Sequence, residues 1–271
     1  FFPAISAEAG ALKEKGCPAP FNWLHPRTMV CTPWDIAWNR VTERRRGHGS
    51  CGVGFGATVE RHLAGMSLRV LDCCNRWVAK EKLRSTGKWY ADRAAVEESR
   101  LPGFLSAWED ESAGFDLDAM CDAMLHPGPG LHWEVAEGAD LADRGDMPRN
   151  LVMEGHQGIL LDQDWGIAPH VTWSSTGSAS ALECAGEFLA GTGLGLASVD
   201  IWYVTRAYQT RHGTGPMSSG TPVDLVNTES ETNVSHPWQG EFRRSALDPD
   251  LVAHALRCDR ADPSSVERTQ E

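Results

Sequence analysis

The segment 154–162, Glu-Gly-His-Gln-Gly-Ile-Leu-Leu-Asp, places one amide side chain, Gln157, next to a glycine at the end of a short apolar run. That run, residues 151–153, predicts a buried parallel strand. Glycine lets a ligand approach the backbone closely, and the Gln157 NH₂ group can then donate a hydrogen bond to a ligand carbonyl. Gln157 is therefore the first candidate for a substrate contact.

A second candidate is the glycine-rich stretch 48–56, which holds four glycines around Ser50 and Cys51 and precedes a predicted helix over residues 57–64. Backbone amides at such a turn, together with the Ser50 hydroxyl, suit a monophosphate. A plain turn is the alternative. The sequence contains no GxxxxGK[ST] phosphate loop.

Three further segments carry polar groups at predicted loop or helix boundaries. The hydroxyl-rich run 171–176 offers Thr172 as a phosphate contact, with helix capping by Thr176 as the alternative. The loop 205–216 follows a predicted strand. In the loop 238–244, Arg243 can hold a carboxylate with two hydrogen bonds, or can be an ordinary solvated arginine.

We predict no metal site, because Asp162, Asp164 and His170 lack the i, i+4 spacing of a helical ligand pair. Turn and capping roles are expected for the two aspartates. No serine or cysteine nucleophile is paired with a histidine in a recognisable pattern.

The composition argues against several classes of protein. The 271 residues carry a net charge of −12, which argues against a nucleic-acid surface. No apolar run approaches the ~20 residues of a membrane helix, and no basic-then-apolar leader is recognisable, so we expect neither a membrane span nor export. The eight cysteines show no CxxC pairing, so reduced thiols and a cytoplasmic location are expected.

The elements that must position these candidates alternate between strands and helices. This order predicts an α/β fold with a largely parallel central sheet flanked by helices, and ligands bound beyond the carboxyl ends of the strands. We expect one domain over residues 1–260 and a loose polar tail over 261–271. The predicted strands are 29–31, 151–153 and 198–204, and the main predicted helices are 6–15, 32–46, 57–64, 116–125, 178–189 and one from residue 249.

The order and spacing of these motifs resemble the adenylosuccinate synthetase family, whose fold is related to the P-loop NTPases. The glycine-rich Ser/Thr loop is followed by Glu-Gly-x-Gln-Gly-x-Leu-Leu-Asp, then Val-Thr-x-Ser, then Ala-Tyr-x-Thr-Arg-x-Gly-x-Gly-Pro. The likeness extends from about residue 3 to 248. It implies a cytoplasmic, homodimeric ligase that uses Mg²⁺ and GTP to join IMP and L-aspartate into adenylosuccinate.

The resemblance also implies roles for individual residues. Gln157 matches the glutamine that binds the 6-oxygen of IMP and steadies negative charge there. Ser50, Cys51 and Gly52 fall in the loop at the IMP phosphate, and Thr172 matches a further phosphate contact. His212 takes the place of a residue whose carbonyl meets the ribose. The loop that clamps the aspartate carboxylates contains Gln239, Gly240 and Arg243.

Several family features are missing or altered. The Mg²⁺-binding phosphate loop, its catalytic base and the guanine-recognition segment do not occur in the sequence, so we expect an internal portion of the family chain without turnover of its own. An arginine that crosses the family's dimer interface falls on Gly65, and Arg61, one turn earlier, is expected to replace it. Cys51 replaces a hydroxyl, and Glu241 would repel a carboxylate unless it points away.

Two other functions stay open at this point. Viral relatives of the family aminate deoxyguanylate, and the altered loops fit such a change of substrate. A catalytically incomplete homologue that binds a purine nucleotide is the second alternative. The sequence does not distinguish GTP from ATP as phosphate donor.

Overall fold

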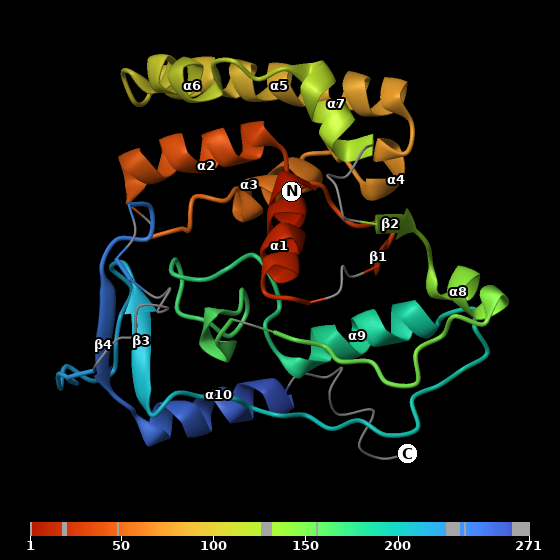
Figure 1. The fold of residues 1–271 in the computed structure, drawn as a ribbon. Helices are drawn as coiled ribbons and strands as arrows, with labels where there is room; N and C mark the ends of the chain where they lie inside the picture. Colours follow the sequence, from red (N-terminus) through yellow and green to blue (C-terminus); the bar gives the residue numbers. More distant parts are fainter. Residues whose placement is uncertain are drawn as a thin grey trace. The chain divides into compact units, whose positions relative to one another are not determined.

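A computed structural model describes residues 2–17, 21–47, 49–125, 132–155, 157–225, 234–235 and 237–261 (Figure 1). The chain divides into two compact units. Unit 1 comprises residues 1–45 and 52–140, and unit 2 comprises residues 46–51 and 141–271. The single domain predicted for residues 1–260 stays a prediction, because the compactness of each unit does not decide how the two are joined.

Unit 1 is mainly helical, and its helices pack around an aromatic core. The Trp38 ring lies 5.3 Å from that of Tyr90 and 5.2 Å from that of Phe104, measured between centroids. Trp108 completes the cluster, 6.0 Å from Trp38. Figure 1 shows α5 and α6 running side by side. The helices are α1 (Phe2–Glu14), α2 (Pro33–Arg46), α3 (Phe55–Leu63), α4 (Val70–Cys73), α5 (Arg76–Glu98), α6 (Phe104–Ser112) and α7 (Leu117–Leu125).

Helix α2 begins as its sequence predicts. The Thr32 amide donates to the Asp35 carboxylate at 2.7 Å, and the Asp35 amide lies 3.3 Å from the Thr32 hydroxyl. This reciprocal capping satisfies two amides that a helix start leaves without partners, and Pro33 occupies the first helical position, where no amide is needed.

A short parallel sheet places unit 1 in the α/β class. Strand β1 (Phe21–Leu24) pairs with β2 (His132–Val135), with Asn22 opposite Trp133. Parallel pairing of strands so far apart in sequence requires a long crossover, which the helices of unit 1 supply. Helix α8 (Gly138–Arg144) follows β2. Both elements lie in the region 126–149, for which neither a strand nor a helix was predicted from the sequence, and residues 126–131 of that region are outside the described part.

The described part of unit 2 contains helices and one antiparallel strand pair. The 3₁₀ turn η1 (Ile159–Leu161) and helix α9 (Ser178–Leu189) precede β3 (Tyr208–His212), and β4 (Phe242–Ala246) leads into α10 (Pro249–Ala261). Strands β3 and β4 pair with Arg211 opposite Arg243. Helix α10 starts as predicted, with the Asp248 carboxylate accepting the amides of Asp250 and Leu251 at 3.0 and 3.1 Å.

The helix predictions are confirmed more fully than the strand predictions. Helices form near 6–15, 32–46, 57–64, 116–125 and 178–189, and α1 begins earlier than expected. None of the three predicted strands is a strand in the described structure: residue 29 makes one isolated bridge to Arg69, and 151–153 and 198–204 are irregular. The α/β class is therefore confirmed, while within the described residues the parallel sheet consists of β1 and β2.

No helix in the described ranges is both long and apolar enough to cross a membrane.

Candidate functional site

Gln157 and Thr172 come together in unit 2. The Gln157 Nε2 lies 3.4 Å from the Thr172 hydroxyl, and the Ser174 hydroxyl lies 3.3 Å from Gln157 Oε1. Both contacts are long for hydrogen bonds, so a ligand atom can replace either of them at little cost. The amide predicted to face substrate therefore lies beside the hydroxyl predicted to face phosphate.

The turn around Asp162 holds these two side chains in place. One Asp162 carboxylate oxygen accepts the Asp164 and Trp165 amides at 2.8 and 3.3 Å, and the other accepts the Thr176 amide at 2.7 Å. The Thr172 amide donates to the Leu161 carbonyl at 2.7 Å. Asp162 is almost fully buried, and its bonds to the Asp164 and Trp165 amides confirm the turn role expected for it.

Capping of α9 differs from the expectation. Thr176 donates its hydroxyl to the carbonyls of residues 158 and 159, at 3.2 and 3.1 Å. The α9 amide of Ser178 is instead bound by the Asp259 carboxylate of α10, at 2.6 Å. Thr176 is therefore not the cap, because an acidic group from a distant helix occupies that position.

Three glycines bring a second set of candidate segments together. A Cβ on Gly213 would lie 3.2 Å from the Gly49 Cα and 3.0 Å from the Gln239 carbonyl oxygen. A Cβ on Gly240 would lie 3.5 Å from the Gly213 Cα. All three glycines have positive φ, at 92°, 67° and 73° for Gly49, Gly213 and Gly240. The loops of residues 49–51, 212–215 and 239–243 thus meet through bare backbone, a surface that side chains would close.

Two arginines lie directly opposite one another beside these glycines. Arg211 donates to the His170 carbonyl at 3.0 Å, and Arg243 donates to the Gly215 carbonyl. Burial and the neighbouring Arg243 charge lower the pKa of Arg211. Neither arginine makes an ion pair within the described part of the chain, and the Arg243 Nε is buried without a hydrogen-bond partner there. Two adjacent cations without a carboxylate favour an anionic ligand.

Arg211 connects the two sets of residues. Its bond to the His170 carbonyl reaches the chain two residues before Thr172, while its own strand carries His212 and leads to Gly213. In the sequence, Arg211 belongs to a family motif, and no role at the site was predicted for it. Its position opposite Arg243 would have required the strand register, which the sequence alone does not give.

The remaining predicted site residues fall in the same loops, with one exception. His212 packs its ring on Phe242 at 4.9 Å between centroids. Ser50 is half-buried and Cys51 is exposed. Glu241 is also exposed, and its carbonyl accepts the Gly213 amide at 3.0 Å. Gly52 belongs to unit 1, where its carbonyl accepts Arg40 Nε at 3.2 Å.

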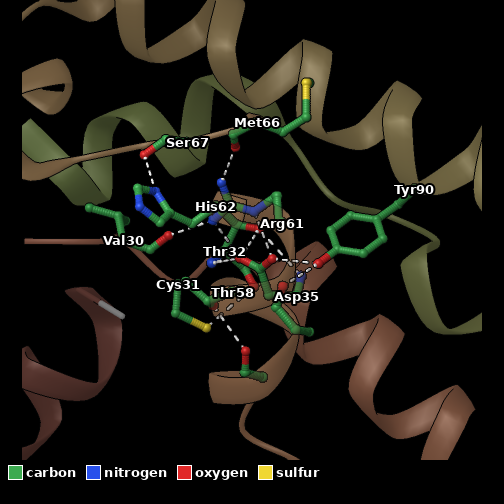
Figure 2. Close-up of polar contacts among 12 residues, drawn as sticks. Val30, Cys31, Thr32, Asp35, Thr58, Arg61, His62, Met66, Ser67 and Tyr90 are labelled. Atoms are coloured by element: carbon green, nitrogen blue, oxygen red, sulfur yellow. Dashed lines mark hydrogen bonds and ion pairs between the residues drawn. The ribbon is translucent and has the colours of Figure 1, made fainter. Parts of the chain in front are cut away.

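Arg61 is built into the core of unit 1 and does not fit the phosphate contact expected of it (Figure 2). Its side chain is 1% exposed, and it pairs with Asp35 at 2.8 Å. Its other nitrogens donate to the carbonyls of Met66 and Val30, at 2.6 and 2.8 Å. All three guanidinium nitrogens are thus used inside the unit, so the described structure gives Arg61 a structural role.

The same network includes residues that the sequence analysis did not single out as a unit. The Tyr90 hydroxyl donates to Asp35 at 2.6 Å, as Figure 2 shows. Burial and the Asp35 carboxylate raise the pKa of Tyr90. Burial alone would lower the pKa of Arg61, but Asp35 outweighs it and the pKa is raised. A buried Asp35–Arg61 pair with these extra bonds is fully satisfied, as a buried ion pair must be.

Among the described residues, no group of three His, Cys, Asp or Glu side chains lies close enough to hold a metal ion.

Comparison with known proteins gives a family. The sequence model of adenylosuccinate synthetase matches residues 2–236. An adenylosuccinate synthetase of Burkholderia mallei is 31% identical over 222 residues, which are 80% of this chain and 45% of that protein. One from Halorhodospira halophila is 30% identical over 227 residues, 82% of this chain and 48% of that protein. The chain thus spans about half the length of the curated relatives it matches.

The fold agrees with this likeness. The solved structure of fully ligated adenylosuccinate synthetase from Plasmodium falciparum superposes with a TM-score of 0.55 at 14% identity, covering 88% of this chain and 52% of that one. At 14% identity, the match supports the fold alone. The family model covers most of the residues of this chain. The chain therefore belongs to the adenylosuccinate synthetase family.

Proposed function

We propose that unit 2 binds IMP as the nucleotide subsite of an adenylosuccinate synthetase-type ligase. Membership of the family makes a ligase of purine biosynthesis the general expectation. The observation that carries the specific proposal is the meeting of Gln157 with Thr172, joined through Arg211 to the loops of Gly213 and Gly240. These are the segments expected to hold base, phosphate and aspartate.

Each group has chemistry suited to its proposed role. The Gln157 NH₂ donates to the 6-oxygen of the purine, where negative charge grows as that oxygen becomes a leaving group. A fixed donor aimed at developing charge stabilises the transition state more than the ground state. The Thr172 hydroxyl and the amides around Ser50 donate hydrogen bonds to the phosphate, whose oxygens accept them.

The arginine pair suits the second substrate. The amino group of L-aspartate attacks the purine carbon that carries the activated oxygen, and its carboxylates need cationic partners while it does so. Arg243 is the proposed carboxylate contact, with its buried Nε available as a donor. Glu241 is exposed, and the proposal requires its carboxylate to point away from the two cations.

The activating phosphoryl group would come from GTP with Mg²⁺, as the family implies. The sequence contains no glycine-rich Walker-type loop, and the described residues offer no metal cluster. We therefore assign this chain no part in holding the triphosphate. A homodimer and a cytoplasmic location belong to the same proposal, and light scattering of the purified chain tests the dimer.

Calorimetric titration with IMP tests the proposal. We expect one site per chain, and about tenfold weaker binding in Gln157→Ala, as loss of one hydrogen bond of about 1.4 kcal/mol implies. Gln163→Ala is the matched control, because Gln163 is exposed six residues further along the chain. Absence of IMP binding, or equal affinity of the two variants, would contradict the proposed pose.

A nucleotide-binding homologue without catalysis is the second candidate, and two residues favour it. Cys51 places a weakly hydrogen-bonding thiol in the phosphate loop, and Glu241 adds an anion to the aspartate loop. Measuring GTP-dependent adenylosuccinate formation separates the candidates, since turnover by the 271 residues alone would exclude this one. Titration with dGMP beside IMP tests the deoxyguanylate alternative, which requires tighter binding of dGMP.

A further inference from the structure

Asp259 lies in the last turn of α10, and its carboxylate is bound to the start of α9. Asp259 is 3% exposed. One of its carboxylate oxygens accepts the Ser178 amide at 2.6 Å, and the other accepts the Ser178 hydroxyl at 2.8 Å. A carboxylate is disfavoured by the negative end of its own helix dipole and favoured by the positive end of another helix. The position of Asp259 therefore benefits α9 and not α10.

Gly177 makes the start of α9 dependent on this carboxylate. Gly177 occupies the cap position, where it has no side chain to accept the first amides of the helix. Its φ of −84° is one that any residue can adopt, so the backbone does not require glycine. A Cβ on Gly177 would, however, collide with Asp259 Oδ1. A serine or aspartate at this position would cap α9 locally, whereas glycine leaves the space to α10.

The same carboxylate holds a second segment of unit 2. The Tyr203 hydroxyl donates to Asp259 Oδ2. Tyr203 precedes β3, which carries Arg211, and Ser178 follows Thr172 in the sequence. Asp259 thus joins the chain after Thr172 to the chain before Arg211. The bond from Arg211 to the His170 carbonyl, at 3.0 Å, joins the same two parts elsewhere.

A short series of contacts leads from the start of α9 to Gln157. Thr176 lies just before Gly177 in the sequence, and its hydroxyl donates to the Gly158 carbonyl at 3.2 Å. Gly158 directly follows Gln157, and the Ser174 hydroxyl lies 3.3 Å from Gln157 Oε1. A displacement of the α9 start would therefore be transmitted to the Gln157 side chain.

We propose that Asp259 is a positioning residue for the nucleotide subsite. By holding the start of α9 and Tyr203 together, it sets the distance between the Gln157–Thr172 pair and the strand that carries Arg211. The Asp259 carboxylate touches no substrate in this role. The inference rests on the proposed IMP site and adds to it a residue that acts from outside the loops of that site.

Spectra of the nucleotide-free protein test the positioning without IMP. Asp259→Asn keeps the shape of the side chain but leaves one acceptor oxygen where the carboxylate has two. We expect the Gln157 NH₂ resonances to shift and exchange of the Ser178 amide to become several-fold faster. Asp250→Asn removes the same charge from an exposed position of α10 and should change neither. Unchanged Gln157 resonances in folded Asp259→Asn would overturn the inference.

Two further variants cover the case in which Asp259→Asn does not fold. Tyr203→Phe removes one hydroxyl and no charge, and should shift the Gln157 NH₂ resonances in the same direction by a smaller amount. Gly186→Ala is the control, because an added Cβ at this position of α9 meets nothing within 4 Å. Absence of a shift in Tyr203→Phe, or an equal shift in Gly186→Ala, would contradict a role for Asp259 in placing Gln157.

Calorimetry with IMP separates positioning from stability alone. Asp259→Asn should weaken IMP binding about fivefold, as a loss of about 1 kcal/mol implies. In the Gln157→Ala background the same change should weaken it less than about twofold, because both substitutions remove one contact and their effects do not add. An equal loss in both backgrounds would show that Asp259 does not act through Gln157. If the parent chain does not bind IMP, the proposed function fails, while the nucleotide-free resonances still decide the role of Asp259.

Discussion

At the scale of single residues, the least expected finding is the buried position of the Arg61 side chain. A guanidinium predicted to meet a phosphate instead closes a buried network with Asp35, Tyr90 and two backbone carbonyls. Its sequence position could not reveal this, because Asp35 lies 26 residues away and on another helix. The capping motif that begins α2 supplies the carboxylate that holds Arg61, so one aspartate serves both functions.

Removing the Arg61 side chain is therefore expected to destabilise the fold and not to weaken ligand binding directly. Arg61→Ala leaves the Asp35 charge buried without its partner, and should lower the free energy of unfolding by about 3–5 kcal/mol. Arg84→Ala is the matched control, because Arg84 is 53% exposed and its pair with Glu81 should contribute less than about 1 kcal/mol. Urea titration measures both. Weaker IMP binding by folded Arg61→Ala, with stability intact, would restore the phosphate role.

Cys51 gives a direct chemical probe of the phosphate loop. Cys51 is an exposed residue, as is Cys184 on α9. Saturating IMP should slow alkylation of Cys51 several-fold and leave Cys184 unchanged, because only the first lies in a loop proposed to bind the nucleotide. Mass spectrometry of iodoacetamide-treated protein measures both rates. Equal rates at Cys51 with and without IMP would remove this loop from the site.

At the scale of elements, the glycine-rich stretch combines a left-handed, closely packed turn with an ordinary helix start. Gly54 has φ +83°, and a Cβ there would lie 2.8 Å from the backbone of Asp35 and Ile36. Gly56, two residues later in α3, has nothing within 4 Å of its added Cβ. The spacing of glycines in the sequence does not distinguish these two positions, whereas the close approach of α2 and the α3 start does.

Paired substitutions test this difference. Gly54→Ala should lower the free energy of unfolding by about 2–4 kcal/mol, from the left-handed backbone and the clash together. Gly56→Ala should raise it by up to about 1 kcal/mol, since alanine favours the helix. Thermal unfolding ranks both against the parent chain. A harmless Gly54→Ala would mean that α2 and α3 do not approach as described.

The contact between α2 and α6 predicts a dependence on pH. Glu111 accepts Arg40 at 3.2 Å and Arg44 at 2.6 Å. Burial works to raise the pKa of Glu111, but the two arginines outweigh it and the pKa falls below its ordinary value of 4.5. A carboxyl group whose pKa is lower in the folded state than in the unfolded state stabilises the fold at pH values above its unfolded-state pKa. This stabilisation is lost as the pH falls through the folded-state pKa.

We therefore expect Glu111→Gln to flatten the loss of stability between about pH 5 and pH 3, by about 1 kcal/mol or less because the arginines are partly exposed. Glu109→Gln, an exposed position on the same helix, controls for net charge. Urea midpoints across this pH range measure the effect. Parallel curves for parent and Glu111→Gln would exclude the ion pair as a source of acid sensitivity.

At the scale of the whole molecule, helices were more predictable than strands, for a physical reason. A helix such as α2 satisfies its backbone locally, so its cap, its apolar stripe and its terminal glycine specify it from sequence. A strand needs a neighbour. The segments 151–153 and 199–204 have the apolar composition of internal strands, but neither belongs to a sheet within the described structure, whereas β1 pairs with β2 in a region where no strand was predicted.

In the candidate site, too, local sequence motifs were predictable and long-range contacts were not. The order of motifs identified Gln157, Thr172 and the three loops, and the structure brings Gln157 to Thr172 and the loops of Gly49, Gly213 and Gly240 to each other. Arg211 was missed because its importance comes from the register opposite Arg243, a long-range fact. Arg61 was expected at a phosphate because it lies one turn before Gly65, and the sequence does not reveal that its side chain is paired with the buried Asp35.

Amide chemical-shift mapping on addition of IMP tests the central claim most directly, since it reports each proposed segment in a single titration. Binding at one composite subsite should shift the amides of Gly49, Gln157, Thr172, Gly213 and Gly240 with a common saturation curve, and leave those of α5 unmoved. Shifts confined to one of the two sets, or spread over unit 1 instead, would show that these groups do not surround a single nucleotide.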